Sequence, residues 1–323
     1  MLRGTSAVTS IVVLLTGVSC GYTSQNVHLP KEKPTAEQMA ELWIEPQNGR
    51  DLFWGVGGKH HAPRTDVTYT AVNSDHAGFS VSYDVEDPDG TEWSAKIGPE
   101  AQTEVAMSRI LWGLGYHQPP VYYLPSWKIK TEDVEEKVES EARFRPKLKE
   151  LHREHDFWLW EDNPFLGTRP LNGLLAIMLM LNSTDLKNDN NTIYRLKEEP
   201  REGARRWYVV RDLGAALGET GKMFPRRNWL AGFEQAGFIK SVKGNQIEFD
   251  YRGRHQELLQ MITPADVRWA SRRMRTLTDE QWHDAFRAAN YTRETTDRYL
   301  RKIREKIAQG LSLQGETTEN EES

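Results

Sequence analysis

Asp185-Leu186-Lys187-Asn188-Asp189-Asn190 decides the fold expected for this chain, together with Val209-Val210-Arg211-Asp212-Leu213-Gly214 a short spacer later. The first stretch carries an asparagine five positions after an aspartate, and the second places Asp-x-Gly directly after an apolar run. The nearly continuous apolar run from Leu171 to Leu181 predicts a buried helix that delivers the first stretch as a loop. Thr192 to Leu196 and Arg206 to Arg211 predict a hairpin between the two stretches. The predicted order is therefore helix, polar loop, hairpin and Asp-x-Gly.

The side chains of these two stretches suit a site that gathers phosphate charge. The carboxylate of Asp185 would position an attacking hydroxyl, while the amide oxygen of Asn190 and the carboxylate of Asp212 would hold Mg²⁺ against the phosphates of a nucleotide. Such a site acts mostly through positioning and electrostatics. The plainer interpretation is a solvated turn, because Asp, Asn and Lys crowd loops for reasons of turn chemistry alone. The apolar helix before the loop and the Asp-x-Gly after the hairpin favour the site.

Alternation of apolar and polar residues predicts strands upstream of these stretches. Strands are expected over Val67 to Val72, Phe79 to Val85 and Glu92 to Ile97, with the turn Asp87-Pro88-Asp89-Gly90 before the third strand. A helix follows, because Pro99 suits a first helical turn and apolar residues then recur at helical spacing. The N-terminal part of the chain is therefore expected to be rich in strands, with one helix.

This order of elements resembles the protein-kinase-like superfamily. The resemblance implies an α+β, two-lobed kinase-like fold, with a small antiparallel β-rich N-lobe and a mainly helical C-lobe. Lys96, in Trp93-Ser94-Ala95-Lys96-Ile97, resembles the strand lysine that contacts nucleotide phosphates. Glu104 on the next helix resembles its partner, and Glu100 is the rival partner, because a lysine on a half-buried strand needs a counter-charge.

The resemblance also implies a role for each residue of the loops, and ATP and Mg²⁺ as cofactors. The implied roles are catalytic for Asp185 and Lys187, cofactor-binding for Lys96 and Glu104, and metal-binding for Asn190 and Asp212. Lys187 would neutralise the transferred phosphate. The implied function is ATP-dependent phosphotransfer, with a nucleotide as partner and the acceptor substrate left open.

Several departures separate the chain from ordinary eukaryotic-type protein kinases. Ser183-Thr184 replaces the usual His-Arg, and Leu213 replaces phenylalanine after the metal-binding aspartate. No GxGxxGxV loop precedes the strand lysine, so the candidates for covering the phosphates are Gly55 to Gly58 and the turn from Ala77 to Ser80. The pattern resembles divergent relatives instead, such as HipA-type kinases and secreted spore-coat-type kinases. In these relatives the catalytic loop often begins with Asn, and Asn182 matches that feature.

The N-terminus predicts a bacterial export signal over residues 1–20. Arg3 supplies a positive start, and the apolar run from Ala7 to Val18 has the length of a signal-peptide core, too short to span a bilayer. Cys20, the one cysteine of the chain, resembles a lipoprotein cleavage site, so a periplasmic or cell-envelope lipoprotein with membrane attachment through lipidated Cys20 is expected. Gly17 departs from that pattern, and cleavage by an ordinary signal peptidase stays open.

The rest of the chain divides by composition. We expect a tether over residues 21–50 with a short helix at Ala36 to Trp43, a β-rich N-lobe over 51–127, a C-lobe over 157–310 and a disordered tail over 311–323. The densely charged residues 128–156 are expected to form a solvated helix or an excursion from the fold. Helix caps are expected at Thr263 and Thr278. The net charge of −5 gives no sign of nucleic-acid binding.

Two alternatives stay open at this stage, and a zinc site is a poor third. An exported pseudokinase or scaffold would keep the kinase-like fold without turnover, which the scarcity of ATP outside the cytoplasm favours. The protein would be a cytoplasmic enzyme if the apolar run near the N-terminus is a misjudged start or an uncleaved anchor. His60-His61 with His76 gives a poor zinc site, because adjacent strand residues point in opposite directions.

Overall fold

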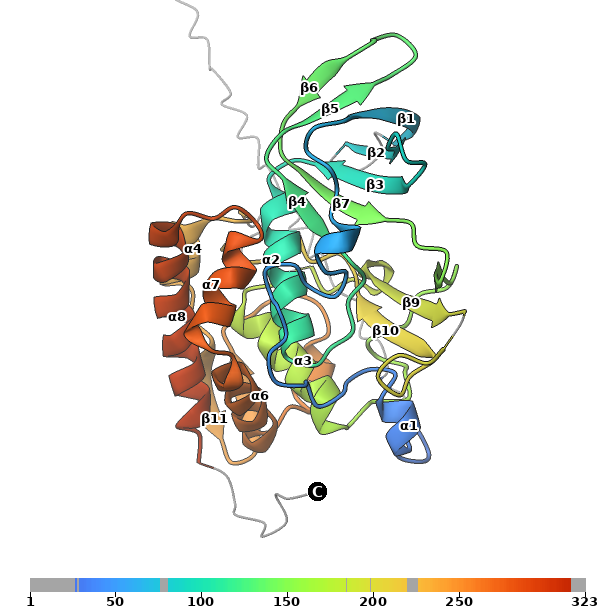
Figure 1. The fold of residues 1–323 in the computed structure, drawn as a ribbon. Helices are drawn as coiled ribbons and strands as arrows, with labels where there is room; N and C mark the ends of the chain where they lie inside the picture. The colour runs from blue at the N-terminus through green and yellow to red at the C-terminus, as the bar shows by residue number, and fades with distance from the viewer. Residues whose placement is uncertain are drawn as a thin grey trace, which may run out of the picture.

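The computed structural model describes residues 27, 29–75, 81–183, 185–197, 199–219 and 226–314. These residues form a β-rich N-terminal lobe above a mainly helical C-terminal lobe (Figure 1). The predicted α+β class, with a β-rich N-lobe and a mainly helical C-lobe, is therefore confirmed. The predicted export signal with Cys20, the Ala77 to Ser80 turn, His76 and the tail from residue 315 lie outside the described residues.

One sheet dominates the N-terminal lobe. Its strands, in the order in which they pair, are β4 (Tyr122–Leu124), β7 (Ala142–Pro146), β3 (Glu92–Ile97), β2 (Ser82–Glu86), β1 (Thr68–Asp75), β5 (Trp127–Lys130) and β6 (Lys137–Glu139). The three strands predicted upstream of the helix are confirmed as β1, β2 and β3. The sheet is mixed rather than antiparallel, because β1 and β5 pair in parallel while the other neighbours pair antiparallel.

The prediction of a solvated helix or an excursion over residues 128–156 is wrong. This segment contains β6, β7 and β8 (Leu151–Arg153), and β7 lies inside the sheet between β3 and β4. All five residues of β7 are buried, including Arg143 and Arg145. The charge density that suggested a solvated surface belongs in part to an interior strand, whose two arginines alternate with Ala142, Phe144 and Pro146.

Helix α2 (Glu100–Gly113) joins the two lobes. It packs on β3, β4 and β7 on one side and on α7 (Asp279–Arg287) on the other. Apolar residues such as Val105 and Ile110 are fully buried, but so are Glu104 and Arg109. Glu104 is paired with Arg143 and Arg145 of β7, and Arg109 donates to Phe53 O and Val121 O, so both buried charges of α2 are satisfied from the N-terminal lobe.

A second sheet of three antiparallel strands, ordered β10-β9-β8, lies below the first. Its β9 (Asn191–Leu196) and β10 (Arg206–Val210) are the predicted hairpin, with Tyr208 opposite Ile193 in the register. Trp158 donates a hydrogen bond to Val209 O at 3.1 Å and so ties the preceding loop to this sheet. The hairpin therefore carries the polar loop at its start and the Asp-x-Gly at its end.

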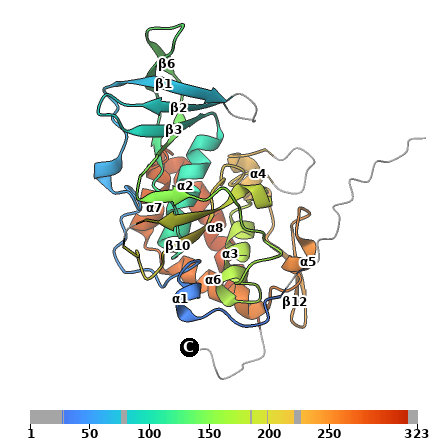
Figure 2. The same ribbon diagram turned by 90° about the vertical axis from the view of Figure 1, so that its right-hand side faces the viewer.

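Helices build the C-terminal lobe around an apolar core. They are α3 (Arg169–Met180), α4 (Leu230–Gln235), α5 (Gln256–Leu259), α6 (Pro264–Thr276), α7 and α8 (Arg293–Leu311). The predicted buried helix is confirmed as α3, which packs against α6 and α8. Sequence reasoning missed the β11 (Ile239–Lys243) and β12 (Gln246–Phe249) hairpin, which with α5 lies at the edge of this lobe (Figure 2).

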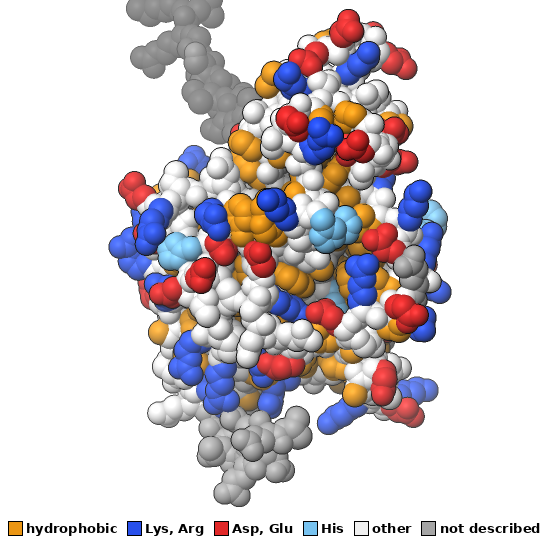
Figure 3. Space-filling view, viewed as in Figure 1, with side chains coloured by type: hydrophobic (Ala, Val, Ile, Leu, Met, Phe, Trp, Pro, Cys, Tyr) orange, Lys and Arg blue, Asp and Glu red, His pale blue; other side chains and the backbone are white. Residues whose placement is uncertain are grey.

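The predicted short helix near the start is confirmed as α1 (Ala36–Met39), but the segment after it is packed rather than a loose tether. Leu42 is fully buried, and Trp43 forms a β-bridge with Tyr116 and packs against Trp269. None of the described helices is long and apolar enough to cross a membrane. Lys, Arg, Asp and Glu side chains are interspersed over the face shown in Figure 3.

The caps predicted at Thr263 and Thr278 are confirmed as capping boxes, and the first gives a direct stability test. Thr263 Oγ1 accepts a hydrogen bond from Asp266 N and donates one to Asp266 Oδ2, so Thr263→Ala removes both. We expect the free energy of unfolding to fall by about 1–2 kcal/mol in urea denaturation. Thr276→Ala, at the other end of α6, should cost less than about 0.5 kcal/mol. Equal effects of the two substitutions would contradict the cap.

Candidate active site

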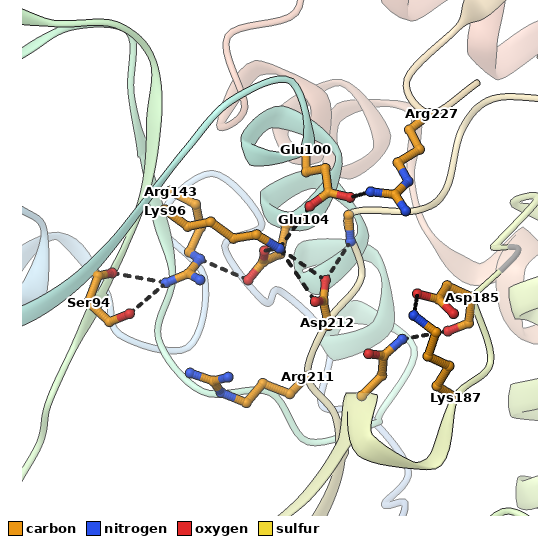
Figure 4. A network of polar contacts seen from close by, with 12 residues as sticks. Ser94, Lys96, Glu100, Glu104, Arg143, Asp185, Lys187, Arg211, Asp212 and Arg227 are labelled. Carbon is orange, nitrogen blue, oxygen red and sulfur yellow. Dashed lines mark hydrogen bonds and ion pairs between the residues drawn. The ribbon is translucent and has the colours of Figure 1, made fainter. Parts of the chain in front are cut away.

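Lys96 stands at the centre of a charged cluster between the two lobes (Figure 4). Its Nζ lies 2.8 Å from Glu100 Oε2, 3.8 Å from Glu104 Oε2 and 3.4 Å from Asp212 Oδ2. Burial works against the charged form of Lys96, but Glu104 and Asp212 outweigh it and raise the pKa of this lysine. The strand lysine, the helix and the Asp-x-Gly predicted from sequence therefore meet at one point.

Lys96 pairs with both glutamates that the sequence offers, Glu104 and its rival Glu100. Glu100, the rival, makes the shorter contact because it lies four residues after Lys96, where α2 begins. Glu100 is in turn paired with Arg227, from the segment before α4. Glu104, at the longer distance, also raises the pKa of Lys96.

Glu104 itself is held by two arginines of β7. Its Oε1 lies 2.9 Å from Arg143 Nε and 2.7 Å from Arg145 Nη2, and all three side chains are buried. Burial alone would raise the pKa of Glu104, but the arginines outweigh it and lower this pKa to about 2. Glu104 is therefore a permanent anion that connects Lys96 of β3 to the arginines of the neighbouring strand.

Asp212 faces Lys96 from the other lobe and keeps contact with solvent. Its side chain is 42% exposed, in contrast to the 6% of Glu100 beside it. Gly214 N donates to Asp212 Oδ1 at 3.4 Å. A Cβ on Gly214 would lie 2.6 Å from Glu100 Cβ, so the glycine of the triplet allows the close approach of α2. The carboxylate of Asp212 thus faces Lys96 while part of it stays in contact with solvent.

The loop predicted to be catalytic lies beside this cluster. Asn190 Nδ2 donates to Asp185 O at 2.7 Å, and Lys187 Nζ lies 3.0 Å from Asp185 Oδ2. The backbone links the loop to the Asp-x-Gly, because Asp212 N and Arg211 N both donate to Asn190 O, at 3.2 and 2.9 Å. Asp185, Asn190 and Asp212 therefore belong to one connected hydrogen-bond network rather than to separate surfaces.

Buried groups of the C-terminal lobe fix the course of this loop. At its start, Lys306 of α8 donates to Asn182 Oδ1 at 2.6 Å and to Met180 O at 3.1 Å. Asn182 has a left-handed backbone (φ 52°) and donates through its side chain to Gly218 O at 2.8 Å. Burial, with a smaller contribution from Lys302, lowers the pKa of Lys306 to about 7. A buried lysine thus satisfies carbonyl groups that the turn after α3 leaves open.

A second clamp holds the middle of the loop. Asn188 donates to Glu161 Oε1 at 2.9 Å and accepts a hydrogen bond from Trp160 N at the same distance. His255 hydrogen-bonds Leu186 O through Nε2 at 2.7 Å, and its other ring nitrogen lies 3.5 Å from Glu161 Oε2. Loop residues held on both sides keep one geometry, which a site that works by positioning requires.

The structure removes one candidate for covering the phosphates. Gly55 to Gly58 packs on the far side of α2, where a Cβ on Gly55 would lie 2.1 Å from Arg109 Nη1 and Gly58 O accepts from Tyr122 Oη at 2.8 Å. Arg109 is five residues beyond Glu104, and five helical steps of about 100° place it roughly 140° around the helix. This glycine run is therefore a packing element.

Sequence reasoning missed several residues that shape the site. They are Arg143 and Arg145 on β7, Arg227 before α4, Glu161 and His255 beside the loop, and Lys306 on α8. The alternation Ala142-Arg143-Phe144-Arg145 is typical of a strand and could have placed the two arginines on one face of it. The others carry no local signal, because their partners are distant in sequence.

The oxygen donors in the cleft suit a hard cation. In the part of the chain that the structure describes, no group of three or more His, Cys, Asp and Glu side chains is arranged to hold a metal ion. Asp212 and Asp185 with the amide of Asn190 supply carboxylate and carbonyl oxygens, which Mg²⁺ accepts when water and phosphate oxygens complete its shell. The donor set therefore fits a magnesium ion that arrives with a phosphate ligand.

Comparison with known proteins gives little beyond this geometry. No family model and no curated protein matches the chain. The crystal structure of a Helicobacter pylori proinflammatory kinase, CtkA, aligns with 77% of this chain and 98% of its own, at 9% identity and a TM-score of 0.36.

Removal of the buried carboxylate tests the charged cluster. Glu104→Gln leaves Arg143 and Arg145 without an anion, and we expect a loss of about 3–5 kcal/mol in the free energy of unfolding at pH 7. The folded pKa of about 2 lies below the ordinary value of 4.5, so this carboxylate stabilises the fold above pH 4.5. The stabilisation, about 3 kcal/mol by linkage, is lost as the pH falls from 4.5 towards 2.

The measurement is urea denaturation of the wild type and the variant across this pH range. The difference between them should shrink towards acid pH. Glu92→Gln, on exposed β3 surface, is the control and should cost less than about 0.5 kcal/mol at every pH. A pH-independent difference for Glu104→Gln would show that the carboxylate is not the anion that the cluster needs.

Proposed function

We propose that this protein is a divergent kinase-like phosphotransferase that uses ATP and Mg²⁺. The observation that carries the proposal is the meeting of Lys96, Asp212 and the Asp185 to Asn190 loop, brought from both lobes into one network. Residues spread over more than a hundred positions of sequence converge where a cation, an exposed carboxylate and an amide stand side by side. Phosphoryl transfer needs this combination.

Each residue has a role that follows from its surroundings. Lys96, held by Glu100 and Glu104, would contact phosphate oxygens, because its positive charge is fixed between the two lobes. Asp212 and Asn190 would hold Mg²⁺, which bridges phosphate oxygens and neutralises developing charge. Asp185, 24% exposed, would orient the acceptor hydroxyl. The ammonium group of its neighbour Lys187 would leave Asp185 and contact the transferred phosphate.

An ion pair between Lys96 and Asp212 joins the two lobes. Lys96 Nζ lies 3.4 Å from both carboxylate oxygens of Asp212, so the two groups neutralise each other across the gap between the lobes. A magnesium ion at Asp212 and phosphates at Lys96 would replace this pair with two stronger charge contacts. Ligand binding is therefore expected to separate Lys96 from Asp212.

Substitutions in the loop separate binding from transfer. Asp212→Asn should weaken Mg²⁺-ATP binding tenfold or more in isothermal titration, because a metal ligand loses its charge. Asp185→Asn should keep Mg²⁺-ATP binding and lower the rate of phosphate release or transfer by at least about a hundredfold. Asp189→Asn is the matched control, since Asp189 lies in the same loop and its side chain is exposed. The control should keep both activities.

The outcome also decides between the enzyme and a second function. An exported pseudokinase or scaffold is favoured by the predicted export signal, because ATP is scarce outside the cytoplasm. Mg²⁺-ATP binding without detectable transfer would support that function. The phosphotransferase proposal fails if the wild type binds no nucleotide or if Asp189→Asn impairs it as strongly as Asp185→Asn.

A further inference from the structure

Glu161 is a buried carboxylate with one oxygen that lacks a hydrogen-bond donor. It lies in the segment before α3, and its side chain is 8% exposed. Its Oε1 accepts a hydrogen bond from Asn188 Nδ2 at 2.9 Å. Its Oε2 is buried and, among the residues that the structure describes, has no hydrogen-bond partner. Such an oxygen is costly to bury unless a donor reaches it.

The group that faces this oxygen is the imidazole of His255. Its Nδ1 lies 3.5 Å from Glu161 Oε2, and its Nε2 lies 2.7 Å from Leu186 O. A carbonyl oxygen only accepts, so Nε2 carries a proton. In the neutral ring Nδ1 is then an acceptor, and two acceptors face each other across 3.5 Å. A proton on Nδ1 would supply the donor that Glu161 Oε2 lacks.

The chain holds His255 in this place with a strained backbone. His255 precedes α5 and has a left-handed backbone (φ 60°), which costs energy in a residue other than glycine. The segment that carries it joins β12 to α5 at the edge of the C-terminal lobe (Figure 2). Its side chain is 6% exposed, and the ring of Trp160 lies 6.5 Å away. Strain at a buried polar residue marks a functional constraint.

The surroundings of His255 keep its ring neutral at pH 7. Burial lowers the pKa of His255 below its ordinary value of 6.5, although the bond to Leu186 O and the charge of Glu161 oppose this effect. Arg254 adds to the lowering. The other charged groups of the neighbouring segments are Asp162, Asp189, Glu257 and the ion pair of Asp185 with Lys187. The second proton therefore binds only in acid solution.

We propose that a proton bound between His255 and Glu161 is a switch that tightens the loop from Asp185 to Asn190 in acid solution. Without this proton, His255 holds Leu186 and Glu161 holds Asn188, and the two supports repel each other. With it, Nδ1–H donates to Glu161 Oε2, and the two supports become one chain of hydrogen bonds. Hydrogen bonds between charged partners are the stronger ones, so the loop gains a firmer hold.

The consequence for catalysis rests on the proposed function, whereas the proton itself does not. His255 and Glu161 would be positioning residues, because they contact Leu186 and Asn188 rather than the groups proposed to react. Leu186 follows Asp185 directly, so a firmer loop fixes the carboxylate proposed to orient the acceptor. The state of the loop would thus follow the pH around the protein.

NMR of ¹⁵N-labelled histidine rings over about pH 4.5 to 8 tests the proton directly. We expect Nε2 of His255 to be protonated and Nδ1 to be unprotonated at the upper end of this range. Glu161→Gln should lower the pKa of His255 by at least about one unit, because the opposing charge is lost. Asp162→Asn, at the exposed next residue, is the matched control and should shift it by less than about 0.3 units. His255→Gln identifies the resonance.

A proton on Nδ1 instead of Nε2 in the neutral ring overturns the proposal. Equal shifts from Glu161→Gln and Asp162→Asn also overturn it. Glu161→Gln should fold, because its amide can donate to Nδ1 while its carbonyl oxygen accepts from Asn188. If it does not fold, the NMR titration of the wild type still decides which ring nitrogen carries the proton.

Hydrogen exchange measures the hold on the loop. Trp160 N donates to Asn188 Oδ1, so protection of this amide reports how firmly Asn188 is kept. Comparison of the wild type with Glu161→Gln at each pH cancels the intrinsic pH dependence of exchange. Relative protection in the wild type should rise about tenfold or more as the pH falls through the pKa of His255. An unchanged ratio overturns the switch.

The two proposals can fail separately, because these measurements need no nucleotide. In a phosphotransferase assay, kcat of the wild type relative to Glu161→Gln should rise as the pH falls through the pKa of His255, with a similar KM for ATP. A pH-independent ratio of the two kcat values overturns the link to catalysis. A wild type that shows the proton but no phosphate transfer leaves the switch and removes the enzyme.

Discussion

The carboxylate of Glu104 is the interaction on which the rest of the structure depends. It is buried on a helix between two lobes, and such a charge is tolerated only when partners surround it. Arg143 and Arg145 approach it from β7, and Lys96 approaches it from β3. A single anion therefore fixes the position of α2 against two neighbouring strands, and with it the direction in which Lys96 points.

The opposite lobe is organised to meet that lysine. The hairpin of β9 and β10 carries the polar loop on one end and Asp212 on the other, and Asn190 O receives two backbone donors from the Asp212 segment. Lys306 and His255 hold the loop from the helical side. Each half of the site thus has its own buried polar support, which favours fixed positions for its charges.

The residues predicted from sequence were those with a local signature. Lys96 lies in an alternating strand, and Asp185, Asn190 and Asp212 stand at fixed spacings beside apolar runs, so their neighbourhood could be inferred. Strand β7 was not predicted, because Arg143 and Arg145 lie in a charged stretch and their partner Glu104 is about forty positions away. The preference of Lys96 for Glu100 depends on where α2 begins, which helix periodicity leaves uncertain by a residue or two.

The most direct measurement is a crystal structure of the protein with Mg²⁺ and a non-hydrolysable ATP analogue. The account predicts one metal ion bound by Asp212 and Asn190, phosphate oxygens at Lys96, and the loss of the 3.4 Å contact between Lys96 and Asp212. A nucleotide bound elsewhere, or an unchanged Lys96–Asp212 pair under saturating analogue, would contradict it.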